Sequence, residues 1–248
     1  MKRFQSAACV LALTLISTGV TGANTVDVVH DGFGARDVTW FWGGGYDGYD
    51  VDAGVYMLNK TGDTGLGSAW RNGSIPGFCI ELHEPAPDVT HTYDVIMPED
   101  MYNSYTGQTL GTTKANYLRE LWARYYDPAW ASGSYTTQDN QAAEAFAAAV
   151  WEIVYEDLPG SAAEWDVTID GTSGLGGFNA ADLDWETANE WLQSLTGGGA
   201  KADLRVLVCD GVQNYLVAVP EPATAILLGL GGLCGALRVK RNSAARGK

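Results

Sequence analysis

The sequence predicts an α+β fold, in which a strand-rich N-terminal part packs on a central alanine-rich helix and two flanking helices, and C-terminal strands close the domain. Three observations predict it. β-Branched and aromatic runs separated by glycine and aspartate come first, the apolar spacing then changes to that of helices, and short β-branched runs return before residue 220. Strands and helices in separate blocks are typical of α+β domains.

The N-terminal strands are predicted from short runs rich in valine, isoleucine and aromatic residues, over 26–29, 38–42, 51–58, 77–82 and 92–96. Glycine-rich segments at 43–45 and 62–65 predict turns between them. Within 77–82, the period of a strand places Cys79 and Glu81 on the face opposite three apolar side chains. Cys79 and Glu81 therefore share one side of the expected sheet.

Apolar residues at helical spacing predict three helices, over 114–126, 137–157 and 180–195. The second is the strongest, because its alanine-rich interior has high helix propensity and its broad apolar stripe suits a buried helix. Thr137 is its predicted N-cap, and Thr112 or Thr113 is expected to cap the first helix. Two closing strands are predicted after the helices, over 204–208 and 215–219.

The first 23 residues have the organisation of a secretory signal peptide. Lys2 and Arg3 form a charged start, 7–16 is apolar, and small residues precede an expected cleavage after Ala23. Only residues 24–218 therefore need to fold after export, and this length can bury a substantial core. Signal peptidase and the secretion machinery are the partners expected at this end.

The last thirty residues form a second targeting segment with three parts. The first is an extended, protease-accessible turn, because proline fixes φ and lacks an N–H, and it consists of Val219, Pro220, Glu221 and Pro222. The second is the apolar run 223–237, a predicted transmembrane segment that alone is short for a bilayer but, with Val239 and snorkelling arginines, is long enough for a thin or tilted insertion. The third is a basic cluster that favours a cytoplasmic end, namely Arg238, Lys240 and Arg241.

This order of parts over 219–248 resembles the PEP-CTERM sorting signal of bacterial surface proteins. The resemblance implies recognition by an exosortase-type membrane protease that cuts near the Pro220–Glu221–Pro222 turn. It also implies a membrane-anchored precursor with a cytoplasmic tail, and a mature protein at the cell surface or outside the cell. Because exosortase systems are associated with exopolysaccharide, an exopolysaccharide or another surface ligand is an expected partner.

The exported body is strongly acidic. Residues 24–218 contain eight lysines and arginines against 29 aspartates and glutamates, a net charge of −21. Nucleic acid and anionic membrane surfaces are poor partners for such a body. Cationic partners and divalent cations are compatible with this charge, but solubility in an external medium is the interpretation we favour.

Two cysteines belong to the exported body, Cys79 and Cys209. Outside the cytoplasm such a pair can form a disulfide. The sequence equally allows two separate buried thiols, and spacing alone does not decide between them.

The segment 51–157 carries a second resemblance, to the thioester domains of bacterial surface adhesins. It consists of Cys79 in the sequence GFCIEL and of an alanine-rich helix with the sequence AFAAAVWEIVYE. The family's helix motif is Thr-Gln-x-Ala-Ile-Trp, and alignment on Trp151 puts Ala147 at the glutamine position. Because alanine has no carboxamide, and Gln138 and Gln141 point elsewhere on a helix, this alignment predicts that Cys79 forms no thioester.

No catalytic residue, metal site or cofactor is predicted. The histidines lack zinc-ligand spacing, and the run 47–52 could offer oxygen ligands to calcium but better fits an exposed turn. Glu152 and Glu156 share a helix face, as a glycoside hydrolase pair can, although a solvated face is the expected setting. Four aromatic residues beside the glycine loop are candidates either to stack on sugars or to fill the core, namely Trp40, Trp42, Tyr46 and Tyr49.

These features together predict an exported structural or adhesive surface protein that is not an enzyme. Two alternatives remain open from the sequence. One is a covalent thioester adhesin with an atypical glutamine, and the other is a carbohydrate-binding module or carbohydrate-active enzyme.

Overall fold

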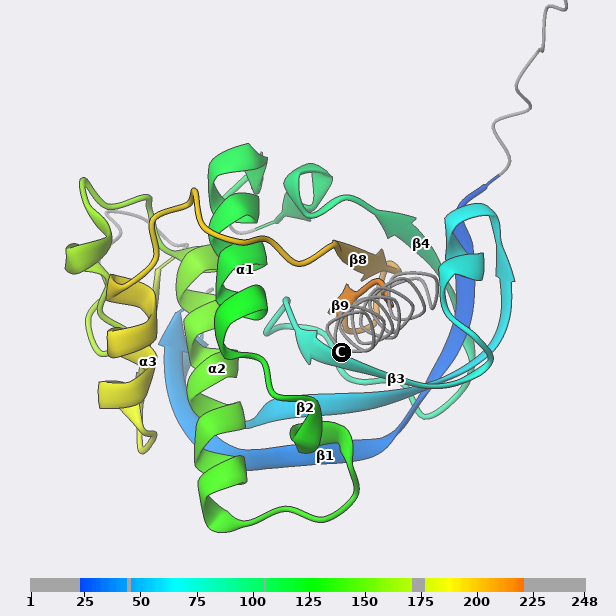
Figure 1. Ribbon diagram of the computed structural model, residues 1–248, viewed down its shortest axis with the longest axis horizontal. Coiled ribbons are helices and arrows are strands. Elements are labelled where there is room, and N and C mark those ends of the chain that lie inside the picture. Colours follow the sequence, from blue (N-terminus) through cyan, green and yellow to red (C-terminus); the bar gives the residue numbers. More distant parts are fainter. Residues whose placement is uncertain (1–22, 44–45, 105, 171–176, 221–248) are drawn as a thin grey trace, which may run out of the picture.

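The computed structural model describes residues 23–43, 46–104, 106–170 and 177–220, and within them the fold is α+β. The helices gather on one side of a curved antiparallel sheet (Figure 1). The predicted fold class is therefore confirmed. The apolar segment 223–237, the basic cluster and nearly all of the predicted signal peptide lie outside the described residues. Within the described ranges, no helix has the length and apolar character needed to cross a bilayer.

Two long strands form the base of the sheet, β1 (Thr25–Gly43) and β2 (Tyr46–Thr64). They pair antiparallel along nearly their whole length, with several register shifts. The sequence predicted two separate strands within β1, but its hydrogen bonding to β2 continues through these irregularities, which is how β-bulges behave. The run 47–52 belongs to β2, so its predicted assignment to an exposed turn is wrong.

Four shorter strands complete a closed ring of hydrogen-bonded strands with β1 and β2. They are β3 (Gly73–Cys79), β4 (His91–Ile96), β8 (Leu204–Val208) and β9 (Tyr215–Ala218). The order is β2-β3-β9-β8-β4-β1, and the β1–β2 pairing closes it. Closure leaves few unpaired edges. The two closing strands thus lie between the early strands β3 and β4, which sets β9 directly beside β3.

Three minor strands lie outside this ring. β7 (Phe178–Ala181) extends the sheet by pairing with the C-terminal end of β1. β5 (Tyr102–Asn103) and β6 (Gln108–Thr109) form a separate two-stranded sheet.

The helices are α1 (Gly111–Tyr125), α2 (Thr137–Tyr155) and α3 (Trp185–Gln193). α2 is buried from Ala143 onward and packs on β1 and β2, with α1 and α3 beside it (Figure 1). The predicted third helix began too early, because 178–181 pairs with β1 as a strand. The predicted cap of the first helix is also wrong, since Thr112 and Thr113 lie inside α1.

The N-cap of α2 is Thr136, one residue before the predicted Thr137. Its hydroxyl accepts the Asp139 amide at 3.1 Å, and the Asp139 carboxylate accepts the Thr136 amide at 2.8 Å. This capping box satisfies two donors that the helix itself cannot pair.

We expect Thr136→Ala to lower the free energy of unfolding by about 1 kcal/mol, because the side-chain half of this capping box is lost. Thr137→Ala is the matched control, since Thr137 is exposed and occupies the first helical position. Urea unfolding measures both. Equal losses in the two variants would contradict the assignment of the cap.

Aromatic side chains join α2 to the sheet. The Phe78 ring of β3 lies 4.6 Å from Phe146 and 5.5 Å from Trp122, measured between ring centroids. Trp151, five residues beyond Phe146, is fully buried, and its ring centroid lies 6.0 Å from that of Phe178. Tightly packed rings of this kind fix the position of β3, and therefore of the residue that ends it, Cys79.

Candidate functional site

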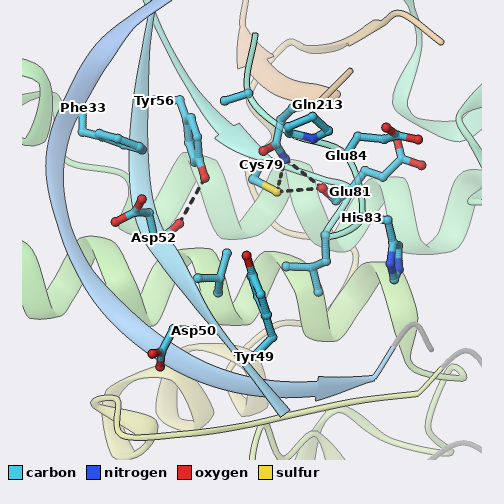
Figure 2. A pocket seen from close by; sticks show the side chains of 14 residues that line it. Phe33, Tyr49, Asp50, Asp52, Tyr56, Cys79, Glu81, His83, Glu84 and Gln213 are labelled. Atoms are coloured by element: carbon cyan, nitrogen blue, oxygen red, sulfur yellow. Dashed lines mark hydrogen bonds between the residues drawn. The ribbon is translucent and has the colours of Figure 1, made fainter. Parts of the chain in front are cut away.

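Cys79 is the last residue of β3 and lies at the floor of a cavity (Figure 2). Its side chain is almost completely buried. After Cys79 the chain leaves the sheet and runs as a loop to β4. One further hydrogen bond follows the strand, because the Ile80 amide donates to the Asn214 carbonyl at 3.1 Å. Cys79 therefore occupies the boundary between a rigid strand and a loop that shapes the cavity.

Gln213 reaches the same point from the other end of the chain. It lies just before β9, which pairs with β3 so that Tyr215 is opposite Cys79. The backbone amide of Gln213 donates to the Pro85 carbonyl at 3.1 Å, and the buried side chain of Gln213 turns toward β3. The Gln213 side-chain nitrogen contacts the Cys79 sulfur directly and donates to the Glu81 carbonyl oxygen at 2.8 Å (Figure 2).

This contact corrects one expectation from the sequence. Alignment on the helix motif placed the glutamine position at Ala147 and predicted that Cys79 forms no thioester by that route. Ala147 is indeed a buried helix residue, but the carboxamide at the sulfur comes from Gln213, which is 134 residues away from Cys79. The signal available in the sequence was a Gln–Asn pair directly before the last predicted strand.

The Cys79 thiol is protonated at neutral pH. Burial raises the pKa of Cys79 to about 12, although hydrogen bonding from the Glu81 backbone, Trp151 and Gln213 opposes the shift. The thiol donates to the Glu81 carbonyl oxygen at 3.1 Å. That one oxygen therefore accepts both the thiol and the Gln213 carboxamide, and it holds the two reactive groups side by side.

Asn214 fixes the segment that carries Gln213. Its side-chain nitrogen contacts the Glu81 carboxylate, and its side-chain oxygen accepts the Cys209 amide at 2.9 Å. The Asn214 backbone carbonyl also accepts the hydrogen bond from the Ile80 amide. Asn214 therefore connects, through hydrogen bonds, the end of β3, the loop after it and the β8–β9 connection. Asn214 is thus a positioning residue for the Cys79–Gln213 contact.

Both cysteines of the body are free thiols, so the disulfide considered from the sequence is not formed in the structure. Cys79 is directed at Gln213 and Glu81, and Cys209 lies partly exposed just after β8. The two thiols are therefore separate, as the second possibility required, but only Cys79 is buried.

The cavity above Cys79 has a volume of about 380 Å³, which falls in the range of about 300–1,000 Å³ typical of small-ligand pockets. It is lined by aromatic and apolar side chains from β1, β2 and the loop after β3, and by four carboxylates. The carboxylates are those of Asp50, Asp52, Glu81 and Glu84. A nucleophilic sulfur, a carboxamide and acidic walls therefore share one pocket.

Glu152 and Glu156 lie elsewhere, at a second cavity of about 260 Å³ beside the end of α2. The sequence placed them on a solvated face, and this is wrong, since both are 2% exposed. Burial, and then repulsion from Glu156, raises the pKa of Glu152 to about 9. Its Oε1 accepts the Asp166 amide at 3.2 Å. Among the described residues, no group of three or more His, Cys, Asp or Glu side chains is arranged to hold a metal ion.

We expect Glu152→Gln to be more stable than the wild type at about pH 8 and equally stable at about pH 4. The pKa of Glu152 is higher in the folded state than in the unfolded state. Its contribution to the free energy of unfolding is therefore fully present below the unfolded-state pKa, and it is lost as the pH rises toward the folded-state pKa. The gain at about pH 8 should be on the order of 1–3 kcal/mol. Urea unfolding at both pH values measures it, with the exposed Glu186→Gln as control. An equal change in the free energy of unfolding at the two pH values would contradict the raised pKa of Glu152.

The aromatic residues near the β1–β2 turn are divided between core and surface. Phe41 is fully buried, Trp40 and Trp42 are half-buried with ring centroids 6.1 Å apart, and Tyr49 is exposed. The Tyr46 side chain lies outside the described part of the chain. Of the four candidate rings, the three whose side chains the structure describes therefore do not form one exposed platform, because only Tyr49 is exposed.

The predicted processing turn begins where the body ends. The Val219 amide donates to the Asp203 carbonyl at 2.8 Å, and Pro220 is exposed. Glu221 and Pro222 lie outside the described residues. The turn therefore starts at the surface, directly after β9.

No curated protein and no solved structure matches the chain significantly. The resemblance of 51–157 to thioester domains thus has no support from these comparisons. One family model matches, over residues 218–241, and it is described as the PEP-CTERM protein-sorting motif. This match confirms the sorting signal predicted at the C-terminus, and the motif implies an exported, membrane-anchored precursor that an exosortase-type membrane enzyme processes.

Proposed function

We propose that this exported protein binds covalently to amines on a partner, through an internal thioester formed between Cys79 and Gln213. The observation that carries the proposal is the contact of the Gln213 carboxamide with the Cys79 sulfur at the floor of a cavity. A buried thiol and a buried carboxamide from distant parts of the chain have no need to meet for packing alone. The alternative of a non-covalent surface protein accounts for export but not for this contact.

Thioester formation is balanced by the two side chains themselves. The Cys79 sulfur attacks the side-chain carbonyl carbon of Gln213, the carbon–nitrogen bond breaks, and the thiol proton leaves with the nitrogen as ammonia. Because the pKa of Cys79 is raised to about 12, the proton is present on the sulfur when it is needed by the leaving group. The Glu81 carbonyl oxygen orients both groups during this step, since it accepts hydrogen bonds from each.

Capture of a partner is the second step. An unprotonated amine attacks the same carbonyl carbon, the carbon–sulfur bond breaks, and Cys79 recovers a proton that the amine releases. The product is an amide between Gln213 and the partner. Burial of the sulfur limits attack by water in the meantime. Each molecule reacts once and keeps its partner, so the protein acts as a reactive adhesive rather than as an enzyme.

The location implied by the sorting motif suits this chemistry. An exported protein meets amines on proteins and other polymers outside the cell, and the sorting motif implies a precursor that is anchored in the membrane of the cell that made it.

The proposal is tested by the intact mass of the protein recovered from the producing cell. A thioester lowers the mass by one ammonia, about 17 Da, and methylamine then converts the deficit into a gain of about 14 Da relative to the unreacted chain. Tandem mass spectrometry should place the methylamide on Gln213. A protein with the full mass expected of its processed ends, unchanged by methylamine, would overturn the proposal.

A further inference from the structure

The charges around the reactive pair restrict the amines that suit the pocket. Asp50 and Asp52 come from β2 on one side of Cys79, whereas Glu81 and Glu84 come from the loop on the other side (Figure 2). Arg36 pairs with Asp52 and neutralises it. Three carboxylates therefore remain without an ion pair among the described contacts.

Nothing positive lines the described part of this cavity at neutral pH. None of its lining residues is a lysine or an arginine. His83 also lines the cavity, but burial lowers the pKa of His83 to about 4, so its imidazole is uncharged. Repulsion from Glu84 is the second cause, after burial, of the raised pKa of Glu81, which indicates that the two carboxylates act on each other in the absence of a cation.

Resting on the proposed thioester, we propose that the pocket selects amine acceptors whose chain carries a second positive charge. The attacking nitrogen must give up its proton before it reacts, and it then has no charge for the carboxylates to attract. A second ammonium on the same acceptor keeps its charge through the transition state, where Glu81, Glu84 or Asp50 stabilises it. Only interactions present in the transition state accelerate the reaction.

The apolar walls fit the stem of such an acceptor. Phe33 and Tyr56 stand edge to face with ring centroids 4.9 Å apart, and Leu82 also lines the cavity. The methylene groups between the two nitrogens of the acceptor can lie along these side chains while its charged nitrogen stays beside the carboxylates that line the cavity.

The test compares 1,4-diaminobutane with butylamine, at equal concentrations of unprotonated amine, by following the loss of the thioester mass deficit over time. Matching the unprotonated amine removes any statistical advantage of the diamine, because its reacting form also offers one unprotonated nitrogen. We expect the diamine to react about five- to tenfold faster at low salt. At about 1 M salt, where the Debye length is about 3 Å, the rate ratio should fall toward one. Glu84→Gln and Asp50→Asn should each lower the ratio, whereas the exposed Glu190→Gln on α3 should leave it unchanged.

Each outcome is decisive. A mass deficit with a rate ratio near one in the wild type overturns this inference and leaves the thioester intact. Absence of the deficit in the wild type overturns the proposed function and this inference together. The deficit also serves as an internal check on every variant, because it reports that the reactive pair is still assembled.

Discussion

Cys79→Ala is expected to abolish both the mass deficit of one ammonia and the methylamine adduct of the exported protein. Gln213→Ala should have the same effect, because each variant removes one of the two atoms that the thioester joins. Gln138→Ala and Gln141→Ala are the matched controls, since these glutamines are exposed at the start of α2 and far along the helix from Trp151. Intact mass spectrometry of the four variants separates Gln213 from every glutamine suggested by the helix motif.

Two results would contradict this assignment. A deficit that survives in Gln213→Ala would mean that another carboxamide reacts with Cys79. A deficit that survives in Cys79→Ala would mean that ammonia is lost elsewhere, for example by cyclisation of the backbone. Asn214→Ala gives a graded outcome, because Asn214 positions Gln213 without reacting, and thioester formation should be slower but not absent.

Trp151→Ala is expected to lower the free energy of unfolding by about 3–5 kcal/mol, the range for deletion of a large buried ring. Trp151 is fully buried, packs against Phe178, and donates its indole N–H to the Cys79 carbonyl oxygen at 2.9 Å. The substitution leaves both a void beneath the sheet and a buried carbonyl without its donor. Urea unfolding provides the measurement.

Trp151→Phe separates the two contributions. It keeps most of the ring volume and removes only the N–H, so a loss of about 1–3 kcal/mol is expected. The control is Trp185→Ala, because this tryptophan is 48% exposed and its loss should change stability by less than about 0.5 kcal/mol. Similar losses for Trp151→Ala and Trp185→Ala would show that Trp151 does not support the floor of the site.

The elements that the sequence predicted well are those whose signal is local. The helical spacing around Tyr117 and Leu121 predicts α1, and the alternation at Thr92–Ile96 predicts β4, because each pattern repeats within one element. The errors at Thr137 and at 178–181 also have local causes. Thr136 and Thr137 are both good caps, and a short apolar segment beside a helix carries no mark of whether it will pair with a strand.

The candidate site depended on long-range pairing, which no local pattern contains. Cys79 was singled out by the resemblance of its segment to thioester domains, but its partner was sought on α2, where Ala147 stands. Gln213 becomes a neighbour only because β9 inserts beside β3 in the closed ring. For the same reason Glu152 and Glu156 were expected on a solvated face, although the segment around Asp166 covers them.

The position of Gln213, seven residues before Pro220, has a mechanical consequence. The sorting motif implies a precursor that is anchored in the membrane by its C-terminal segment. If the precursor binds a partner at Gln213, as proposed, tension between the partner and the anchored segment would run through residues 214–219. Shear flow would therefore stretch β9 and the residues beside it, and the remaining fold would not have to resist extension for the partner to be retained.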